Sequence, residues 1–318
     1  MTNGSCNFSL DEDRVGLTCI YSLSFALGLP ANLLSLWGLC QLWHSGRGVQ
    51  LVCLLNLLLS DLLQLLTLPL WIVYLQGAHR WPYQAAACNI VGYLFYVNLY
   101  ASVVFLCLIA LDRYLAIVHP LGSRGIRTVP VALLSGLAVW ILTFLLCITG
   151  LYPSVFHPDN QRCLEQYPVS ARYACFKIGT IVLGFLLPCG ILGYTSARIS
   201  MTLQNSPSTS DHDRRKVMGT LFVITVIFVV IFGPYHLLGS YKFVAFFLTD
   251  NHCALEQSLF LTYRLCYGLT SLNNLLDPLL YIFLSNNIRQ ELRSMPCLRK
   301  GLQHPQRGQK PQPSPLPE

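Results

Sequence analysis

Residues 88–120 read CNIVGYLFYVNLYASVVFLCLIALDRYLAIVHP, and this stretch combines a long apolar run with charge at one end only. The run is apolar from Asn89 to Leu111. At about 1.5 Å per residue, a helix of that length crosses a bilayer core of about 30 Å. Asp112 and Arg113 follow directly. Charges are costly in hydrocarbon, so we expect this pair at the membrane edge or inside a protein bundle.

The composition of the whole chain supports the same class. Its 318 residues are 53% hydrophobic and only 11% charged, with a mean hydropathy of +0.51. Soluble domains carry about 25% charged residues, so we predict an all-α membrane protein. No P-loop, HExxH or GxSxG motif is present. We therefore expect neither a catalytic site nor a metal site.

Seven apolar spans follow one another and predict a seven-transmembrane helix bundle. They cover residues 15–43, 49–75, 86–118, 129–151, 172–203, 215–247 and 256–284. With the N-terminus outside, most of the 21 Lys and Arg residues fall on the inner side, as the positive-inside rule requires. The net charge of +7 comes mostly from these inner-side basic residues, so we do not expect nucleic-acid binding.

The regions flanking the bundle have their own signatures. Residues 1–14 are expected to be an extracellular tail, with glycosylation sequons at Asn3 and Asn7. Residues 285–297 predict a short amphipathic helix eight, and the Pro/Gln-rich residues 298–318 predict a disordered cytoplasmic tail. Four of the 13 cysteines fall in loops or at helix ends, which suggests two disulfides in an oxidising compartment. These four are Cys6, Cys88, Cys163 and Cys253.

The order of short motifs resembles the rhodopsin-like family of G-protein-coupled receptors over about residues 15–297. The motifs are Gly28-Leu29-Pro30-Ala31-Asn32, Leu59-Ser60-Asp61, Asp112-Arg113-Tyr114, Trp140, Pro188, Phe232-Gly233-Pro234-Tyr235 and Asp277-Pro278-Leu279-Leu280-Tyr281. Each motif alone is weak, but this order across seven spans is very specific. The resemblance implies a plasma-membrane receptor that activates a heterotrimeric G protein.

The resemblance also implies roles for particular residues. Asp112, Arg113, Tyr114 and Tyr281 would form the G-protein switch, with Arg113 paired to Asp112 at rest. Asp61, Ser102, Asn273, Asn274 and Asp277 would line a polar pocket able to hold a sodium ion; a static polar cluster is the alternative. Cys88 would pair with Cys163 and Cys6 with Cys253, the second bridge being less certain.

On the inner face, two features would regulate the receptor. Cys297 follows the amphipathic stretch among basic residues and is a candidate for palmitoylation, with a free thiol as the alternative. Arrestin is a further expected partner. Its phosphorylation sites would be Ser206, Ser208, Thr209 and Ser210, since the tail past Cys297 offers only Ser314 as a hydroxyl.

Within the family, the phrases Thr67-Leu68-Pro69-Leu70-Trp71, His79-Arg80-Trp81, Asn98-Leu99-Tyr100 and Pro234-Tyr235-His236-Leu237 are similar to the proton-sensing and lysolipid-responsive branch. Phe95 stands where amine receptors carry an Asp, and Ser271 where opsins carry the retinal Lys. An amine ligand and retinal are therefore excluded.

Two stimuli remain open. Protons could charge His79, His157 and His252, which lie near the outer face and titrate near neutral pH. Repulsion from Arg80 and Arg162 would then bias the bundle; simple solvation of the histidines is the alternative. Thr143 and Arg264 depart from the proton-sensing pattern, which weakens this first stimulus.

The second stimulus is an anionic lipid such as a lysophospholipid or an oxidised fatty acid. Its head group would bind basic side chains through strong hydrogen bonds, unless these cations pair with Glu165 and Glu256 or snorkel to the interface. The basic candidates are Arg172, Lys177, Lys242 and Arg264, with Arg264 as the first to test. Phe95, Tyr96, Tyr100, Tyr235, His236 and Tyr263 would line the acyl chain. A constitutively active receptor without such a ligand is one alternative, and a transporter or channel using Asp61 and Asp277 is another.

Overall fold

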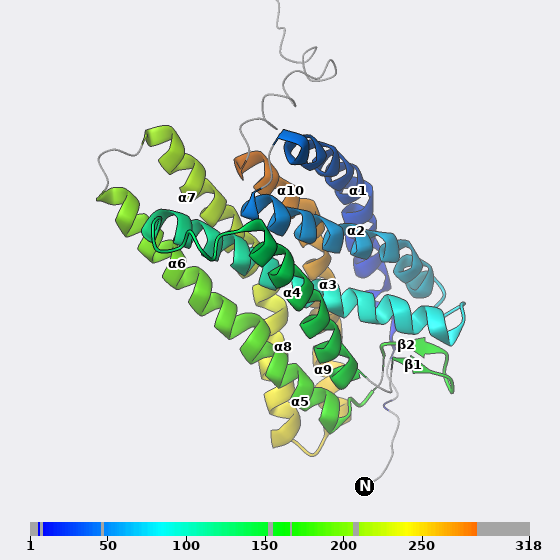
Figure 1. Cartoon of the computed structure of the whole chain (residues 1–318). Coiled ribbons are helices and arrows are strands. Elements are labelled where there is room, and N and C mark those ends of the chain that lie inside the picture. Colours follow the sequence, from blue (N-terminus) through cyan, green and yellow to red (C-terminus); the bar gives the residue numbers. More distant parts are fainter. Residues whose placement is uncertain are drawn as a thin grey trace, which may run out of the picture.

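A computed structural model of the chain describes residues 6, 9–45, 48–151, 155–165, 167–205 and 210–284. In these residues the chain forms a bundle of long helices (Figure 1). The first four spans are continuous helices, preceded by the short 3-10 turn η1 (Asp11–Asp13). They are α1 (Arg14–Ser45), α2 (Val49–Gln76), α3 (Ala85–Val118) and α4 (Val129–Leu151).

The fifth and sixth spans each contain a π-helical turn just before a proline. The fifth is α5 (Ala171–Ile181), η2 (Val182–Leu186) and α6 (Leu187–Gln204). The sixth is α7 (Asp211–Val226), η3 (Ile227–Phe232) and α8 (Gly233–Leu248). Pro188 and Pro234 each stand in the first turn of the α-helix that follows. Proline lacks an N–H and its ring crowds the preceding carbonyl, so the wider π turn accommodates the change in helical pairing.

The seventh span is broken and more polar than the other six. It comprises α9 (His252–Leu269), the 3-10 turn η4 (Thr270–Leu272) and α10 (Asn273–Leu284). Six of the described helical spans are long and apolar enough to cross a membrane by length and composition alone. The first half of the seventh carries Glu256 and Arg264, which lowers its hydropathy. The seven-helix expectation is therefore confirmed, with the seventh crossing made by two helices in series.

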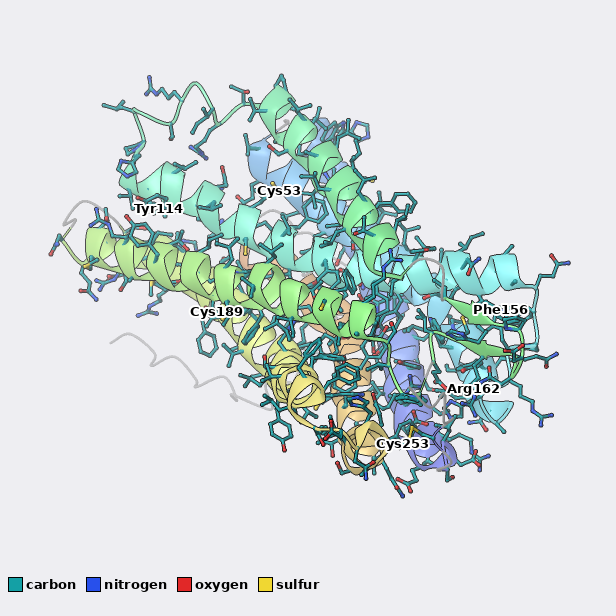
Figure 2. The ribbon with its side chains drawn as sticks, turned by 90° about the horizontal axis from the view of Figure 1, so that it is seen from below. Cys53, Tyr114, Phe156, Arg162, Cys189 and Cys253 are labelled. Carbon is teal, nitrogen blue, oxygen red and sulfur yellow. A yellow bond between two sulfur atoms is a disulfide. The ribbon has the colours of Figure 1, made fainter. Side chains whose placement is uncertain are left out.

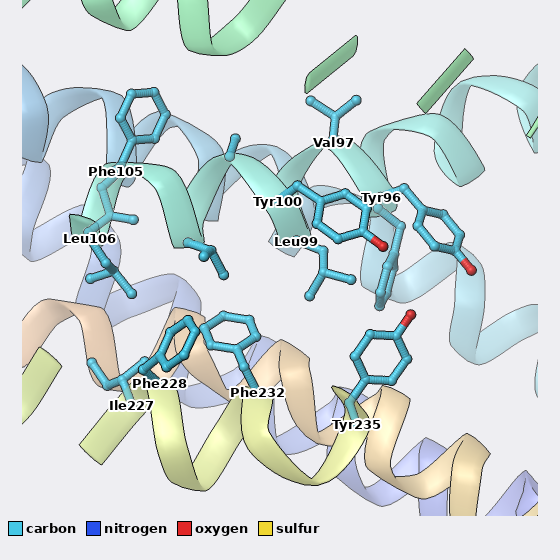
Figure 3. Close-up of a cluster of buried hydrophobic side chains, with 14 of the residues drawn as sticks. Tyr96, Val97, Leu99, Tyr100, Phe105, Leu106, Ile227, Phe228, Phe232 and Tyr235 are labelled. Carbon is cyan, nitrogen blue, oxygen red and sulfur yellow. The ribbon is translucent and has the colours of Figure 1, made fainter. Parts of the chain in front are cut away.

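α3 is the central helix of the bundle. It packs against α2, α4 and α6 and buries most of its residues. Figure 3 shows part of the core, in which Leu99 of α3 points toward Phe232 of η3. Phe105 points to the other side of α3, where its ring lies 5.8 Å from that of Trp140 on α4. By contrast, α4 exposes apolar side chains such as Leu134 and Leu142, as expected of a helix that faces lipid.

The two ends of the bundle carry different structures. One end holds the hairpin of β1 (Phe156–His157) and β2 (Arg162–Cys163), which contacts α3 near its start. Figure 2 shows Phe156, Arg162 and Cys253 at this end and Tyr114 at the other. We refer to them below as the outer and inner ends, following the orientation predicted from charge.

Both expected disulfides are present at the outer end, which confirms their pairing. Cys88 and Cys163 join the start of α3 to β2, with Cα atoms 5.8 Å apart. Cys6 and Cys253 join the N-terminal segment to the start of α9, with Cα atoms 5.3 Å apart. Together they anchor the segments that cover the outer end.

Candidate functional site

A buried cluster of four charged groups closes the outer end. Arg264 on α9 donates from Nε to Asp13 Oδ2 at 2.5 Å and pairs through Nη2 with Glu165 Oε1 at 2.7 Å. His79 lies between the same two acids, 3.1 Å from Asp13 and 3.0 Å from Glu165. The side chains of Asp13 and Glu165 are 0% and 1% exposed. The cluster thus connects η1, the loop after α2, the loop after β2, and α9.

The electrostatics of this cluster differ from what the sequence suggests. Burial alone would lower the pKa of His79, but its hydrogen bonds to Asp13 and Glu165 outweigh that effect and raise the pKa to about 9. Burial would raise the pKa of Glu165, but Arg264 and His79 hold it below its usual value. His79 is therefore a charged partner in an ion-pair cluster at neutral pH. His79 is buried between two carboxylates, so it is neither the solvated side chain of the alternative nor placed as the predicted repulsion from Arg80 and Arg162 requires.

A cavity of about 120 Å³ opens beside the cluster. Among the residues that sequence reasoning assigned to a ligand or to proton sensing, Arg172, Lys242, Arg264, Tyr96, Tyr263 and His157 line it. Tyr21, Trp71, Tyr167, Tyr173 and Tyr267 also line it, although the motifs did not single them out. The only sequence feature that could have indicated them is that they are aromatic residues near the outer ends of the predicted spans. The lining suits a ligand with an apolar body and a few polar groups.

The remaining ligand candidates do not line the cavity, and all but His236 contact a side chain that does. Tyr235 packs against Tyr263 and Tyr267 at 5.5 Å between ring centroids, and Phe95 packs against Tyr267 at 4.7 Å. His236 stacks on Phe185 at 5.0 Å. Figure 3 shows Tyr96 and Tyr100 on one helix facing Tyr235 on another. The predicted aromatic side chains therefore cluster, but of that set only Tyr96 and Tyr263 line the cavity. His252, the third pH candidate, stacks on Phe246 at 4.3 Å and does not line the cavity.

The four candidate cations differ in what neutralises them. Arg264 has two carboxylates, and Lys242 Nζ lies 2.6 Å from Glu256 Oε2. Arg172 donates to the carbonyl of Thr149 at 2.7 Å and is exposed.

Lys177 is the exception. It is 2% exposed and donates to the Tyr235 hydroxyl at 2.6 Å. Its ammonium lies 4.1 Å from the centre of the Tyr96 ring. Among the described residues, no carboxylate forms an ion pair with Lys177. Within the described part of the chain, only aromatic rings and a hydroxyl are placed to stabilise a charge on Lys177.

A second polar site lies in the middle of the bundle. Asp61 and Asp277 are fully buried and close enough to interact. Neither oxygen of Asp61 has a hydrogen-bond partner among the described residues, nor does Oδ1 of Asp277. Asn273 donates to Asp277 at 3.5 Å, and Ser102 meets Ser60 at 3.3 Å. The side-chain oxygens of Asn273 and Asn274 are also without partners there. Such a set of oxygen donors fits a small hard cation.

At the inner end, Asp112 has two cationic partners. Arg113 Nη2 lies 2.6 Å from Asp112 Oδ2, as the resemblance implies, and Arg127 Nε lies 2.9 Å from Oδ1. The Tyr114 hydroxyl meets His119 Nε2 at 3.0 Å. The side chain of Tyr281 lies outside the described residues, as do Asn3, Asn7, Cys297, residues 285–318 and residues 206–209.

Comparison with known proteins gives a consistent result. A family model described as "7 transmembrane receptor (rhodopsin family)" matches residues 31–281. Probable G-protein coupled receptor 132 of Homo sapiens is 34% identical over 290 residues, covering 90% of this chain and 75% of that protein. The uracil nucleotide/cysteinyl leukotriene receptor of Mus musculus is 30% identical over 302 residues (93% and 87%). G-protein coupled receptor 68 of Homo sapiens is 31% identical over 292 residues (91% and 78%).

Proposed function

Because the chain belongs to the rhodopsin family of seven-transmembrane receptors, we propose that it converts binding of an anionic lipid outside the cell into G-protein activation inside. It is a multi-pass membrane receptor and not an enzyme. The ligand class proposed is a lysophospholipid or an oxidised fatty acid, received at the outer cavity. The two disulfides at that end support an extracellular N-terminus at the plasma membrane, because disulfides persist in oxidising compartments.

The observation that carries this proposal is that Lys177 is buried and has no carboxylate partner among the described residues. A buried ammonium without an anion is unfavourable, so a ligand carboxylate or phosphate there gains a strong charge-assisted hydrogen bond. Tyr96 and Tyr173 line the cavity, contact Lys177 through their rings, and bond to each other at 2.7 Å between hydroxyls. A ligand that separates these two hydroxyls would reach Lys177 from the cavity. One relative is named for uracil nucleotides and cysteinyl leukotrienes, and both are anions.

We expect Lys177→Met to weaken activation by the lipid about 10- to 100-fold, since a hydrogen bond to a charged group is worth about 1.5–3 kcal/mol. The measurement is G-protein activation across a panel of lysophospholipids and oxidised fatty acids. Arg80→Gln, which changes an exposed cation at the same end that does not line the cavity, is the matched control and should shift potency little. Equal potency of Lys177→Met and the unmutated chain would exclude Lys177 as the anchor. Silence of the unmutated chain to the whole panel would exclude the lipid class.

Protons are the second candidate stimulus, and His157 in the cavity lining is the observation that favours them. His79 contributes little here, because a pKa of about 9 leaves it charged throughout the range from pH 8 to pH 6. We therefore expect G-protein activation without lipid to stay nearly flat over that step. A steep rise that His157→Phe abolishes, but that His252→Phe leaves intact, would instead establish a proton sensor.

We propose that the pocket of Asp61 and Asp277 holds a sodium ion in the resting receptor. The ion would give a partner to both oxygens of Asp61 and to Oδ1 of Asp277, which have none among the described residues. We expect NaCl to raise the melting temperature of the purified receptor relative to N-methylglucamine chloride at equal ionic strength. Asp61→Asn should abolish that difference. An identical difference in the mutant would assign the salt effect to another site.

A further inference from the structure

Asp112 at the inner end of α3 is a buried carboxylate that two arginines share. Its side chain is 5% exposed. Arg113, its neighbour on the same helix, takes one oxygen at 2.6 Å, and Arg127 takes the other at 2.9 Å. Each carboxylate oxygen therefore has its own guanidinium, and neither arginine needs the other in order to pair.

Arg127 is held in place by contacts that do not involve Arg113. It lies in the segment between α3 and α4, where its N–H donates to the carbonyl of Ser123 at 2.9 Å. The hydroxyl of Ser123 in turn donates to the carbonyl of Leu115 on α3 at 3.1 Å. The segment is thus fastened to α3 itself. A movement of the Arg113 side chain leaves these contacts intact.

A carboxylate in this position needs a cation in every state of the receptor. Removing one partner of a buried ion pair is strongly unfavourable, because the remaining charge is left without compensation. If signalling requires Arg113 to turn from Asp112 to the G protein, as the proposed function entails, Asp112 must keep another partner.

We propose that Arg127 is the positioning residue that stays with Asp112 when Arg113 leaves, and that it thereby favours the signalling arrangement. The opposite role, a second lock on the resting state, would require Arg127 to release Asp112 as well. Without Arg127, departure of Arg113 would leave the Asp112 carboxylate without a cation. The equilibrium between the resting and signalling arrangements would then shift toward the resting one. Loss of Arg127 should therefore weaken coupling rather than raise basal activity.

The first test uses thermal unfolding of the purified receptor and needs neither ligand nor G protein. We expect Arg113→Gln and Arg127→Gln each to lower the melting temperature only slightly, since one arginine still neutralises Asp112. In the double variant, the melting temperature should fall by more than about 5 °C beyond the sum of the two single decreases. Adding Asp112→Asn should remove that excess. Simple additivity of the two single variants would overturn the proposal.

The second test measures binding of nucleotide-free heterotrimeric G protein to the receptor in nanodiscs. Arg127→Gln should weaken binding about tenfold, whereas in an Asp112→Asn background the same change should have no effect. Arg124→Gln, in the same segment and exposed, is the matched control. Tighter binding by Arg127→Gln would make it a lock, and equal weakening in both backgrounds would make it a direct G-protein contact; either result overturns the proposal. If the unmutated chain binds no G protein, the proposed function fails, and thermal unfolding still tests whether Arg113 and Arg127 each neutralise Asp112.

Discussion

Replacing Arg264 by alanine is expected to remove most folded receptor from the cell surface. The change would leave Asp13 and Glu165 buried with only His79 between them. Breaking a buried ion pair from one side costs about 3–5 kcal/mol. Proteins are stable by only about 5–15 kcal/mol, so this is a large fraction of the total. Surface labelling of an N-terminal epitope and the melting temperature of the purified receptor measure the effect.

Two further variants separate lost charge from lost packing. Arg80→Ala, which removes an exposed arginine at the same end, should leave surface level unchanged. A triple variant, Asp13→Asn, Glu165→Gln and Arg264→Gln, leaves no unpaired carboxylate beside His79. It should therefore recover much of the surface level that Arg264→Ala loses. Normal surface level of Arg264→Ala would mean that Arg264 is not needed to hold the cluster.

The stability of the receptor should fall as the pH rises from about 6.5 to about 9. The pKa of His79 is raised from 6.5 to about 9 in the folded chain, so folding favours the protonated ring. That contribution is fully present below the unfolded pKa and is lost as the pH passes the folded one. The total is about 3 kcal/mol at about 1.4 kcal/mol per pKa unit. Chemical unfolding at a series of pH values measures the slope.

His79→Gln should remove this alkaline slope, although the variant is less stable at pH 6.5. Glu165 has the opposite linkage: its lowered pKa means that its contribution disappears only on the acid side, below its ordinary value of 4.5. We therefore expect a plateau near pH 5.5–6.5. The same alkaline slope in His79→Gln and in the unmutated chain would assign the titration to another group.

The fold follows from local sequence features. Long apolar runs bounded by charge predict each transmembrane helix from the local sequence alone, and they locate α1 to α4 closely. The broken seventh span was harder to predict, because η4 and Gly268 just before it lie against α1, which is far away in the sequence. The disulfide pairings came from the family resemblance, since four loop cysteines allow more than one pairing.

The charge cluster could not be predicted in the same way. Asp13 precedes the first span and looks like a solvated acid, and Arg264 looks like an anchor for a ligand. Their hydrogen bond joins residues 251 positions apart, so no local pattern reveals it. Lys177, by contrast, looks like any interfacial lysine. The sequence does offer Glu165 and Glu256 as anions for the basic candidates, and Arg264 and Lys242 pair with them. Only the three-dimensional arrangement shows that Lys177 lies among aromatic rings instead.

The bridge between Cys6 and Cys253 makes most of the receptor a covalent ring. The two cysteines are 247 positions apart, so the first and seventh spans are tied to each other outside the membrane. A single protease cut between residues 164 and 252 would consequently yield two fragments that stay joined. The nicked receptor would run at full length on a non-reducing gel and separate only after reduction. Enzyme treatment of intact cells can therefore sever an outer loop without shedding either half of the molecule.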